Sequence, residues 1–177
     1  MHISLHNATI RSLRPHDADS LARHANNPKV ACNLRDCFPS PYSVEDAIWF
    51  LESVASSCPA TVFAIAVGSA AVGTIGVRLR TDIDRVGAEL GYWLGEEFWG
   101  QGIMTEAVAA FRDFALREYN LTRLEATVFV GNDASAKVLE KTEFVREATL
   151  RRSAVKNNVI IDRWSYAYVL EPNVASR

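Results

Sequence analysis

Apolar residues follow two different periods along this chain. Between Ala88 and Leu94 they take every second position, which is typical of a half-buried strand. From Met104 to Ala115 they recur at helical spacing instead. The sequence Gly-Gln-Gly at residues 100–102 separates the two stretches. The chain is therefore predicted to run from a strand through a glycine turn into an amphipathic helix.

The same periods predict the remaining elements, with an irregular, proline-containing segment at residues 30–42. A strand that follows a helix favours parallel pairing, so we expect a mixed, mostly antiparallel α/β sheet of about seven strands with helices on both faces. Their expected order is β-αα-βββ-α-β-α-ββ. The strands are expected at residues 8–13, 61–67, 72–80, 86–94, 124–130, 144–152 and 159–170, and the helices at residues 17–27, 43–54, 104–120 and 132–141.

Length and composition favour one globular domain over residues 1–177. The formal net charge of −2 argues against general nucleic-acid binding, which requires a basic excess. We expect no membrane segment and no signal peptide, because no apolar run is long enough and the first residues lack the required pattern. The three cysteines are too few and too irregularly spaced for a disulfide framework, which favours the cytoplasm. The histidines all precede residue 25, and we predict no metal site.

The glycine turn is a candidate anion site, because glycine exposes backbone N–H groups and the following helix adds its own free amides. A P-loop is disfavoured, because Ile103 and Met104 follow Gly102 where Lys and Ser or Thr are required. A dinucleotide fingerprint is also disfavoured, since it requires a small residue where Thr105 stands. A nucleotide-binding domain and a plain tight turn remain alternatives.

Residues 89–107 resemble the acetyl-CoA-binding motif of the GNAT N-acetyltransferase superfamily, written Gln/Arg-x-x-Gly-x-Gly/Ala. Trp99 and Met104 depart from its first and last positions, and Trp-Gly-x-Gly followed by Thr-Glu-Ala resembles the RimJ/RimL-like branch. The resemblance implies the GNAT acyl-CoA N-acyltransferase fold, in which the fourth and fifth strands splay apart around the pantetheine arm. It also implies acetyl-CoA as cosubstrate, bound by Trp93, Leu94, Trp99, Gly100, Gln101, Gly102, Ile103, Met104, Thr105 and Asn132.

Acetyl transfer to an amine benefits from a general base and from stabilisation of the leaving thiolate. Glu89 is the candidate base, with a solvated position or an ion pair to Arg78 or Arg80 as the alternative. Related enzymes commonly place a Tyr acid where this chain has Leu139, so Ser135 is the candidate partner of the thiolate. The alternative is that Asn132 only caps its helix and Ser135 is a buried helix serine.

These features predict an N-acetyltransferase that acts by direct attack of a primary amine within a ternary complex. The acceptor is expected to be a protein N-terminal amine or a small-molecule amine, in contact with Arg35, Phe38 and Tyr42. A covalent acetyl-cysteine route is disfavoured, because the cysteines lie far in sequence from the motif. The alternative function is a catalytically silent acyl-CoA-binding sensor or interaction module. We expect a monomer or a homodimer.

Overall fold

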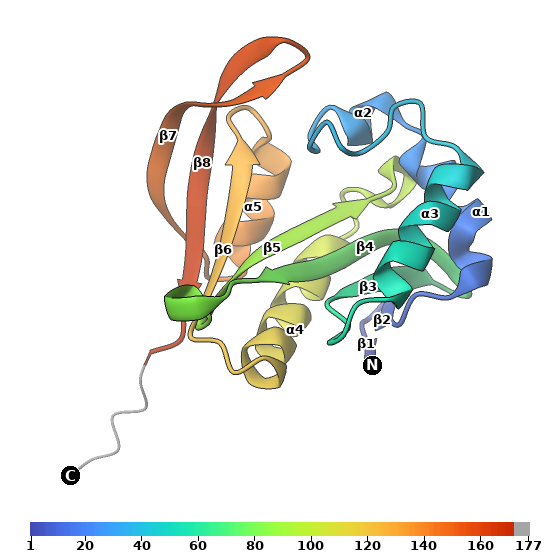
Figure 1. Cartoon of the computed structure of the whole chain (residues 1–177), viewed down its shortest axis with the longest axis horizontal. Helices are drawn as coiled ribbons and strands as arrows, with labels where there is room; N and C mark the ends of the chain where they lie inside the picture. Colours follow the sequence, from blue (N-terminus) through green and yellow to red (C-terminus); the bar gives the residue numbers. More distant parts are fainter. Residues whose placement is uncertain (172–177) are drawn as a thin grey trace.

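Eight strands form one mixed sheet in the order β1-β2-β3-β4-β5-β6-β8-β7 (Figure 1). The computed structural model describes residues 1–171. Neighbouring strands in this part of the chain are antiparallel except β5 and β6, which are parallel as predicted. The strands are β1 (His2–Ser4), β2 (Thr9–Arg11), β3 (Val62–Val67), β4 (Ala70–Leu79), β5 (Gly87–Leu94), β6 (Arg123–Phe129), β7 (Val145–Lys156) and β8 (Val159–Val169).

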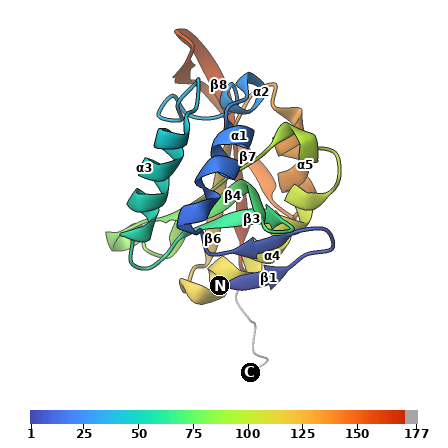
Figure 2. The ribbon, with the colours of Figure 1, turned by 90° about the vertical axis from the view of Figure 1, so that its right-hand side faces the viewer.

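Helices cover both faces of the sheet, and each face has its own apolar core (Figure 1, Figure 2). The longer helices are α1 (Ala18–Ala25), α3 (Val44–Ala55), α4 (Ile103–Glu118) and α5 (Asp133–Lys141). The short ones are η1 (Pro15–Asp17), α2 (Pro28–Ala31), η2 (Asp82–Asp84) and η3 (Glu96–Phe98). α4 and α5 pack on one face through residues such as Phe111 and Leu139, whereas α1 and α3 pack on the other through Leu21 and Ala47.

The predicted mixed α/β fold and element order are confirmed, with two additions. β1 brings the sheet to eight strands instead of about seven. It was missed because three residues at the sheet edge, two of them exposed, are too few to show a period. α2 lies partly in the segment that was expected to be irregular, and it starts where the Asn27 side chain accepts the N–H of Lys29 and Pro28 takes the first position.

β7 extends to Lys156, beyond the predicted end at residue 152. The strand is bulged twice and mostly exposed, so neither face carries a continuous apolar pattern. By contrast, the predicted cap of α3 is present. Ser43 Oγ accepts the N–H of Asp46 at 3.1 Å, and Asp46 Oδ2 accepts the N–H of Ser43 at 2.8 Å.

The ladder between β5 and β6 is short, and this positions the site. Pairing runs only from Gly87 with Arg123 to Glu89 with Glu125. Beyond Glu89 the two strands part, while β5 remains paired with β4 as far as Leu94. The expected splaying of the fourth and fifth strands is thus found. These two strands are β5 and β6, because the additional strand β1 shifts the numbering by one.

Candidate active site

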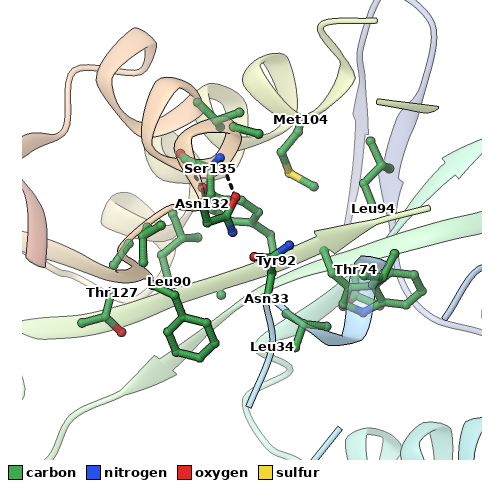
Figure 3. A pocket seen from close by; sticks show the side chains of 18 of the residues that line it. Asn33, Leu34, Thr74, Leu90, Tyr92, Leu94, Met104, Thr127, Asn132 and Ser135 are labelled. Carbon is green, nitrogen blue, oxygen red and sulfur yellow. Dashed lines mark hydrogen bonds between the residues drawn. The ribbon is translucent and has the colours of Figure 1, made fainter. Parts of the chain in front are cut away.

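A cleft of about 1140 Å³ opens where β5 and β6 part. Its walls come from β4, β5, β6, the turn into α4, one side of α5, the segment between α2 and α3, and the β7–β8 hairpin. Figure 3 shows Ser135, Asn132 and Tyr92 close together in it, with Met104 and Leu94 further along and Asn33 and Leu34 on the opposite segment. The cleft therefore joins the predicted cofactor turn to the predicted acceptor segment.

The glycine turn has the geometry expected of an anion site. Gly100 and Gly102 have φ angles of +73° and +81°, which only glycine adopts without strain. A Cβ at either position would meet no atom within 4 Å, so the space beside the turn is open to a ligand. Because an α-helix cannot pair the N–H groups of its first turn internally, Ile103, Met104 and Thr105 present theirs at this end of the cleft. The turn thus fits the phosphates of acetyl-CoA.

Most of the predicted cofactor residues lie around the cleft. Trp93, Leu94, Trp99, Gly100, Gly102, Ile103, Met104, Thr105 and Asn132 all line it. Trp99 is 43% exposed, and its Nε1 donates to the carbonyl oxygen of Leu94 at 2.8 Å, which fixes the turn to the end of β5. The exception is Gln101, whose side chain turns back to donate to the carbonyl oxygen of Glu97 at 2.8 Å.

The edge of β5 exposes backbone groups to the cleft. Gly95 donates its N–H to the carbonyl oxygen of Val72 on β4 at 2.8 Å. Since alternate residues of an antiparallel ladder point to the same neighbour, Trp93 also pairs with β4, and the N–H groups of Tyr92 and Leu94 point the other way. β6 has already parted there, so these donors are available to a thioester oxygen as negative charge develops on it.

Asn132 and Ser135 meet at the start of α5, together with a residue that the sequence analysis did not select. Asn132 Oδ1 accepts the N–H of Ser135 at 3.2 Å, so Asn132 does cap the helix. The hydroxyl groups of Ser135 and Tyr92 lie 2.9 Å apart and share a hydrogen bond. Burial raises the pKa of Tyr92 to about 12, so this phenol acts as a hydrogen-bond donor and not as a ready proton source. Leu139, where a Tyr acid is common, is fully buried in the core.

Removing either hydroxyl of this pair is expected to slow thiolate release. Ser135→Ala should lower the single-turnover rate at saturating acetyl-CoA by ~30-fold or ~2 kcal/mol, somewhat less than the loss of one oxyanion-hole donor. Tyr92→Phe should have a smaller effect, and the double variant should be no slower than Ser135→Ala, because the two groups act through one hydrogen bond. Strictly additive losses would show that the two hydroxyl groups act independently, and a wild-type rate for Ser135→Ala would show that the serine only packs. Calorimetric acetyl-CoA affinity within a few-fold of wild type is the control for an intact site.

Glu89 lies half-buried on β5, on the face opposite Tyr92. Its Oε2 accepts a hydrogen bond from Arg78 Nη2 and its Oε1 accepts one from Arg35 Nη2. Burial raises the pKa of Glu89, but the hydrogen bonds from Arg78 and Arg35 outweigh it and hold this pKa below its usual value. The ion pair with Arg78 considered from sequence is therefore present, and Arg35 from the predicted acceptor segment joins it. Glu89 is ionised and able to take a proton, but it is a weak base.

The three predicted acceptor residues take different places. Arg35 and Phe38 line the cleft, and Phe38 packs edge-on against Trp93 with ring centroids 5.8 Å apart. Tyr42 does not reach the cleft: it is 7% exposed, and it packs behind Phe38 in the core between the sheet and α1 and α3. Burial raises the pKa of Tyr42 to about 12. Its place is therefore to support Phe38.

Basic residues outside the predicted set also line the cleft. Lys137 and Lys141 lie one turn apart on α5, and both line the cleft that also contains the start of α4. At the other end, Lys156 of β7 pairs with Asp36 at 2.8 Å and so connects the hairpin to the segment between α2 and α3. Arg163 of β8 lies nearby. The spacing of Lys137 and Lys141 was visible in the sequence, but the place of Lys156 depends on the hairpin.

Within residues 1–171, no helix is long and apolar enough to cross a bilayer. In that same part of the chain, no three or more His, Cys, Asp and Glu side chains come together as a metal site. Cys32, Cys37 and Cys58 are free and exposed.

Comparisons with known proteins identify the family. Residues 7–145 match the profile of a family described as Acetyltransferase (GNAT) domain. The uncharacterized N-acetyltransferase p20 of Bacillus licheniformis is 30% identical over 162 residues, which cover 90% of each chain. The ribosomal-protein-serine acetyltransferase of Escherichia coli (strain K12) is 31% identical over 84 residues, which cover 48% of this chain and 47% of that protein.

The fold also matches solved structures. RimL, a ribosomal L7/L12 alpha-N-protein acetyltransferase solved in complex with coenzyme A, superposes with a TM-score of 0.85 at 21% identity, covering 96% of this chain and 98% of that one. The resemblance to the GNAT superfamily is confirmed by the family match, and the superposition shows that the fold is shared with RimL. Acetyl-CoA is the cosubstrate that the cleft and its turn accommodate. This chain belongs to the GNAT acetyltransferases and is an acetyl-CoA-dependent N-acetyltransferase.

Proposed function

We propose that this enzyme acetylates the α-amino group of a peptide chain by direct attack within a ternary complex. The observation that carries this choice is the pairing of Glu89 with two arginines, which lowers its pKa. A weak base suits an α-amine, which titrates near ~8, better than a lysine side chain, which titrates near ~10.4. The RimL structure and the E. coli relative, which are named for acting on ribosomal proteins, point the same way.

Each group of residues in the cleft has its own role in the reaction. The amine reaches the cleft from the side of Arg35 and Phe38, and as its nitrogen bonds to the acetyl carbon it loses a proton to the Glu89 carboxylate, directly or through water. The backbone N–H groups of Tyr92 and Leu94 stabilise the charge that develops on the thioester oxygen. The hydroxyl pair of Ser135 and Tyr92 donates to the departing sulfur. A thiol titrates near ~8.5, so the thiolate needs only this limited help before it takes a proton from water.

A comparison of amines tests the acceptor class. A short peptide with a free α-amino group should release thiol from acetyl-CoA ~10²-fold faster at neutral pH than the same peptide with a blocked N-terminus and an internal lysine. The ratio follows from the smaller neutral fraction of the lysine amine. Mass spectrometry of the product should place the acetyl group on the first residue. Faster turnover of polyamines or other small amines than of any peptide would instead favour the small-molecule acceptor.

A further inference from the structure

The acceptor half of the cleft has an excess of positive charge, although the whole chain has a formal net charge of −2. Apart from Lys29, which pairs with Glu96, its acidic lining residues are Asp36 and Glu89, and its basic ones are Arg35, Arg78, Lys156 and Arg163. A bound α-amine in this half brings no negative charge of its own. The excess therefore indicates that some other part of the acceptor carries an anionic group.

Two of the four basic side chains are already engaged away from the acceptor. Lys156 is only 12% exposed and pairs with Asp36 at 2.8 Å. Arg163 is partly buried, unlike Arg35 and Arg78, and donates its Nε to the hydroxyl of Ser153 at 3.1 Å. The side chains that remain accessible are therefore chiefly Arg35 and Arg78.

Arg35 and Arg78 retain most of their hydrogen-bonding capacity. Each gives one Nη2 group to Glu89, and within residues 1–171 neither guanidinium has a second hydrogen-bond partner. A guanidinium carries five N–H groups in a planar fork that matches a carboxylate. The two side chains are 57% and 70% exposed, whereas the Glu89 side chain between them is 19% exposed. Their spare donors thus face the open cleft.

We propose that the peptide acceptor carries an aspartate or glutamate at its first or second position, whose carboxylate binds Arg35 and Arg78. The inference rests on the proposed function, because it takes the acceptor to be a peptide α-amine. Both guanidinium groups contact Glu89 directly, so an anion bound to them lies about one side-chain length from an amine at Glu89. One residue of extended chain spans ~3.5 Å, which limits the anion to the first two residues.

Binding of this carboxylate also changes Glu89. The acceptor carboxylate takes the spare donors of the two arginines that also hold Glu89, so two carboxylates then share their positive charge and Glu89 is held less strongly. Glu89 is then better able to take the amine proton. An acidic acceptor should therefore raise kcat as well as lower KM.

Matched peptides test this proposal. Two peptides that begin Ser-Glu and Ser-Gln, and are otherwise identical, differ in charge but hardly in shape. At low salt the wild-type enzyme should give a kcat/KM ~10-fold or more higher for the Ser-Glu peptide, as expected for charge-assisted paired hydrogen bonds. The ratio should fall below ~3 in Arg35→Gln and in Arg78→Gln, and to an intermediate value in Arg35→Lys, which keeps the charge but loses the fork.

Arg80→Gln is the matched control. Arg80 lies two residues after Arg78, just beyond the end of β4, but it pairs with Glu125 and does not line the cleft, so the ratio should stay at its wild-type value. An equal or lower kcat/KM for the Ser-Glu peptide overturns the anionic subsite, and so does a ratio that survives in both Arg35→Gln and Arg78→Gln. A ratio carried by KM alone overturns the effect of the bound carboxylate on Glu89. Turnover of small amines but of neither peptide overturns the proposed function itself.

Discussion

Gly102→Glu is expected to lower the affinity for acetyl-CoA by ~10²-fold or more while the fold is kept. The new side chain would enter the open space beside the turn, at the N-terminal start of α4 where free N–H groups face the cleft. Its carboxylate would also repel the phosphates, and two like charges ~4 Å apart near a protein surface cost ~4 kcal/mol. Isothermal titration calorimetry gives the affinity, and circular dichroism gives the fold.

Gly68→Glu is the control for backbone strain. Gly68 has a φ of +59° in the turn between β3 and β4, and a Cβ there also meets no atom within 4 Å. The substitution therefore introduces the same charge and a similar left-handed strain away from the cleft. Its melting temperature should fall about as much as that of Gly102→Glu, while its affinity for acetyl-CoA stays unchanged. Equal affinities of the two variants would remove the phosphate site from the turn.

Glu89→Gln is expected to lower kcat by ~10²-fold, with acetyl-CoA affinity little changed. Glutamine keeps the shape and still accepts hydrogen bonds, but it cannot take the amine proton. Because the pKa of Glu89 is held below its usual value, the wild-type residue stays ionised from pH 6 to 9. The wild-type rate in this window should therefore follow the titration of the acceptor amine alone. A variant with the same rate and the same pH profile as wild type would exclude Glu89 as the base.

Glu125→Gln is the matched control for Glu89→Gln. Glu125 is the β6 partner of Glu89 in the ladder, is 20% exposed against 19% for Glu89, and likewise pairs with two arginines, Arg80 and Arg123. It does not line the cleft. A kcat near wild type in Glu125→Gln would show that the loss in Glu89→Gln comes from the position of the carboxylate and not from a broken ion pair in the sheet.

The parts of the site that depend on neighbouring residues were predictable from the sequence. The turn at residues 100–102 and the start of α4 are local, so the motif placed them correctly. The pairing of Glu89 with Arg78 follows from the hairpin register of β4 and β5, which are also close in sequence. The pairing of Glu89 with Arg35 spans 54 residues and depends on how the segment after α2 folds over the sheet, so no local pattern indicates it.

Tyr92 and Tyr42 are two side chains whose surroundings could not be predicted from the sequence. Tyr92 falls on the buried face by alternation, and nothing local shows that β6 leaves this strand beyond Glu89 and exposes the tyrosine hydroxyl to a cleft. Tyr42 lies in a segment with two prolines that looks exposed, yet it is buried behind Phe38, and its N–H donates to Asn26 Oδ1 at 3.1 Å. In both cases the environment is decided by elements distant in sequence.

The short β5–β6 ladder also has a mechanical consequence. It divides the sheet into two parts, β1 to β5 and the set β6, β8 and β7, which are joined by three residue pairs at one end and are not paired at the other. A small rotation about these three pairs would widen or narrow the cleft without breaking strand pairs inside either part. The Asp36–Lys156 ion pair joins the segment after α2 to the β7–β8 hairpin, on the side where β5 and β6 are unpaired. The width of the cleft is therefore expected to depend on two features, the backbone hydrogen bonds of the short ladder and this one ion pair.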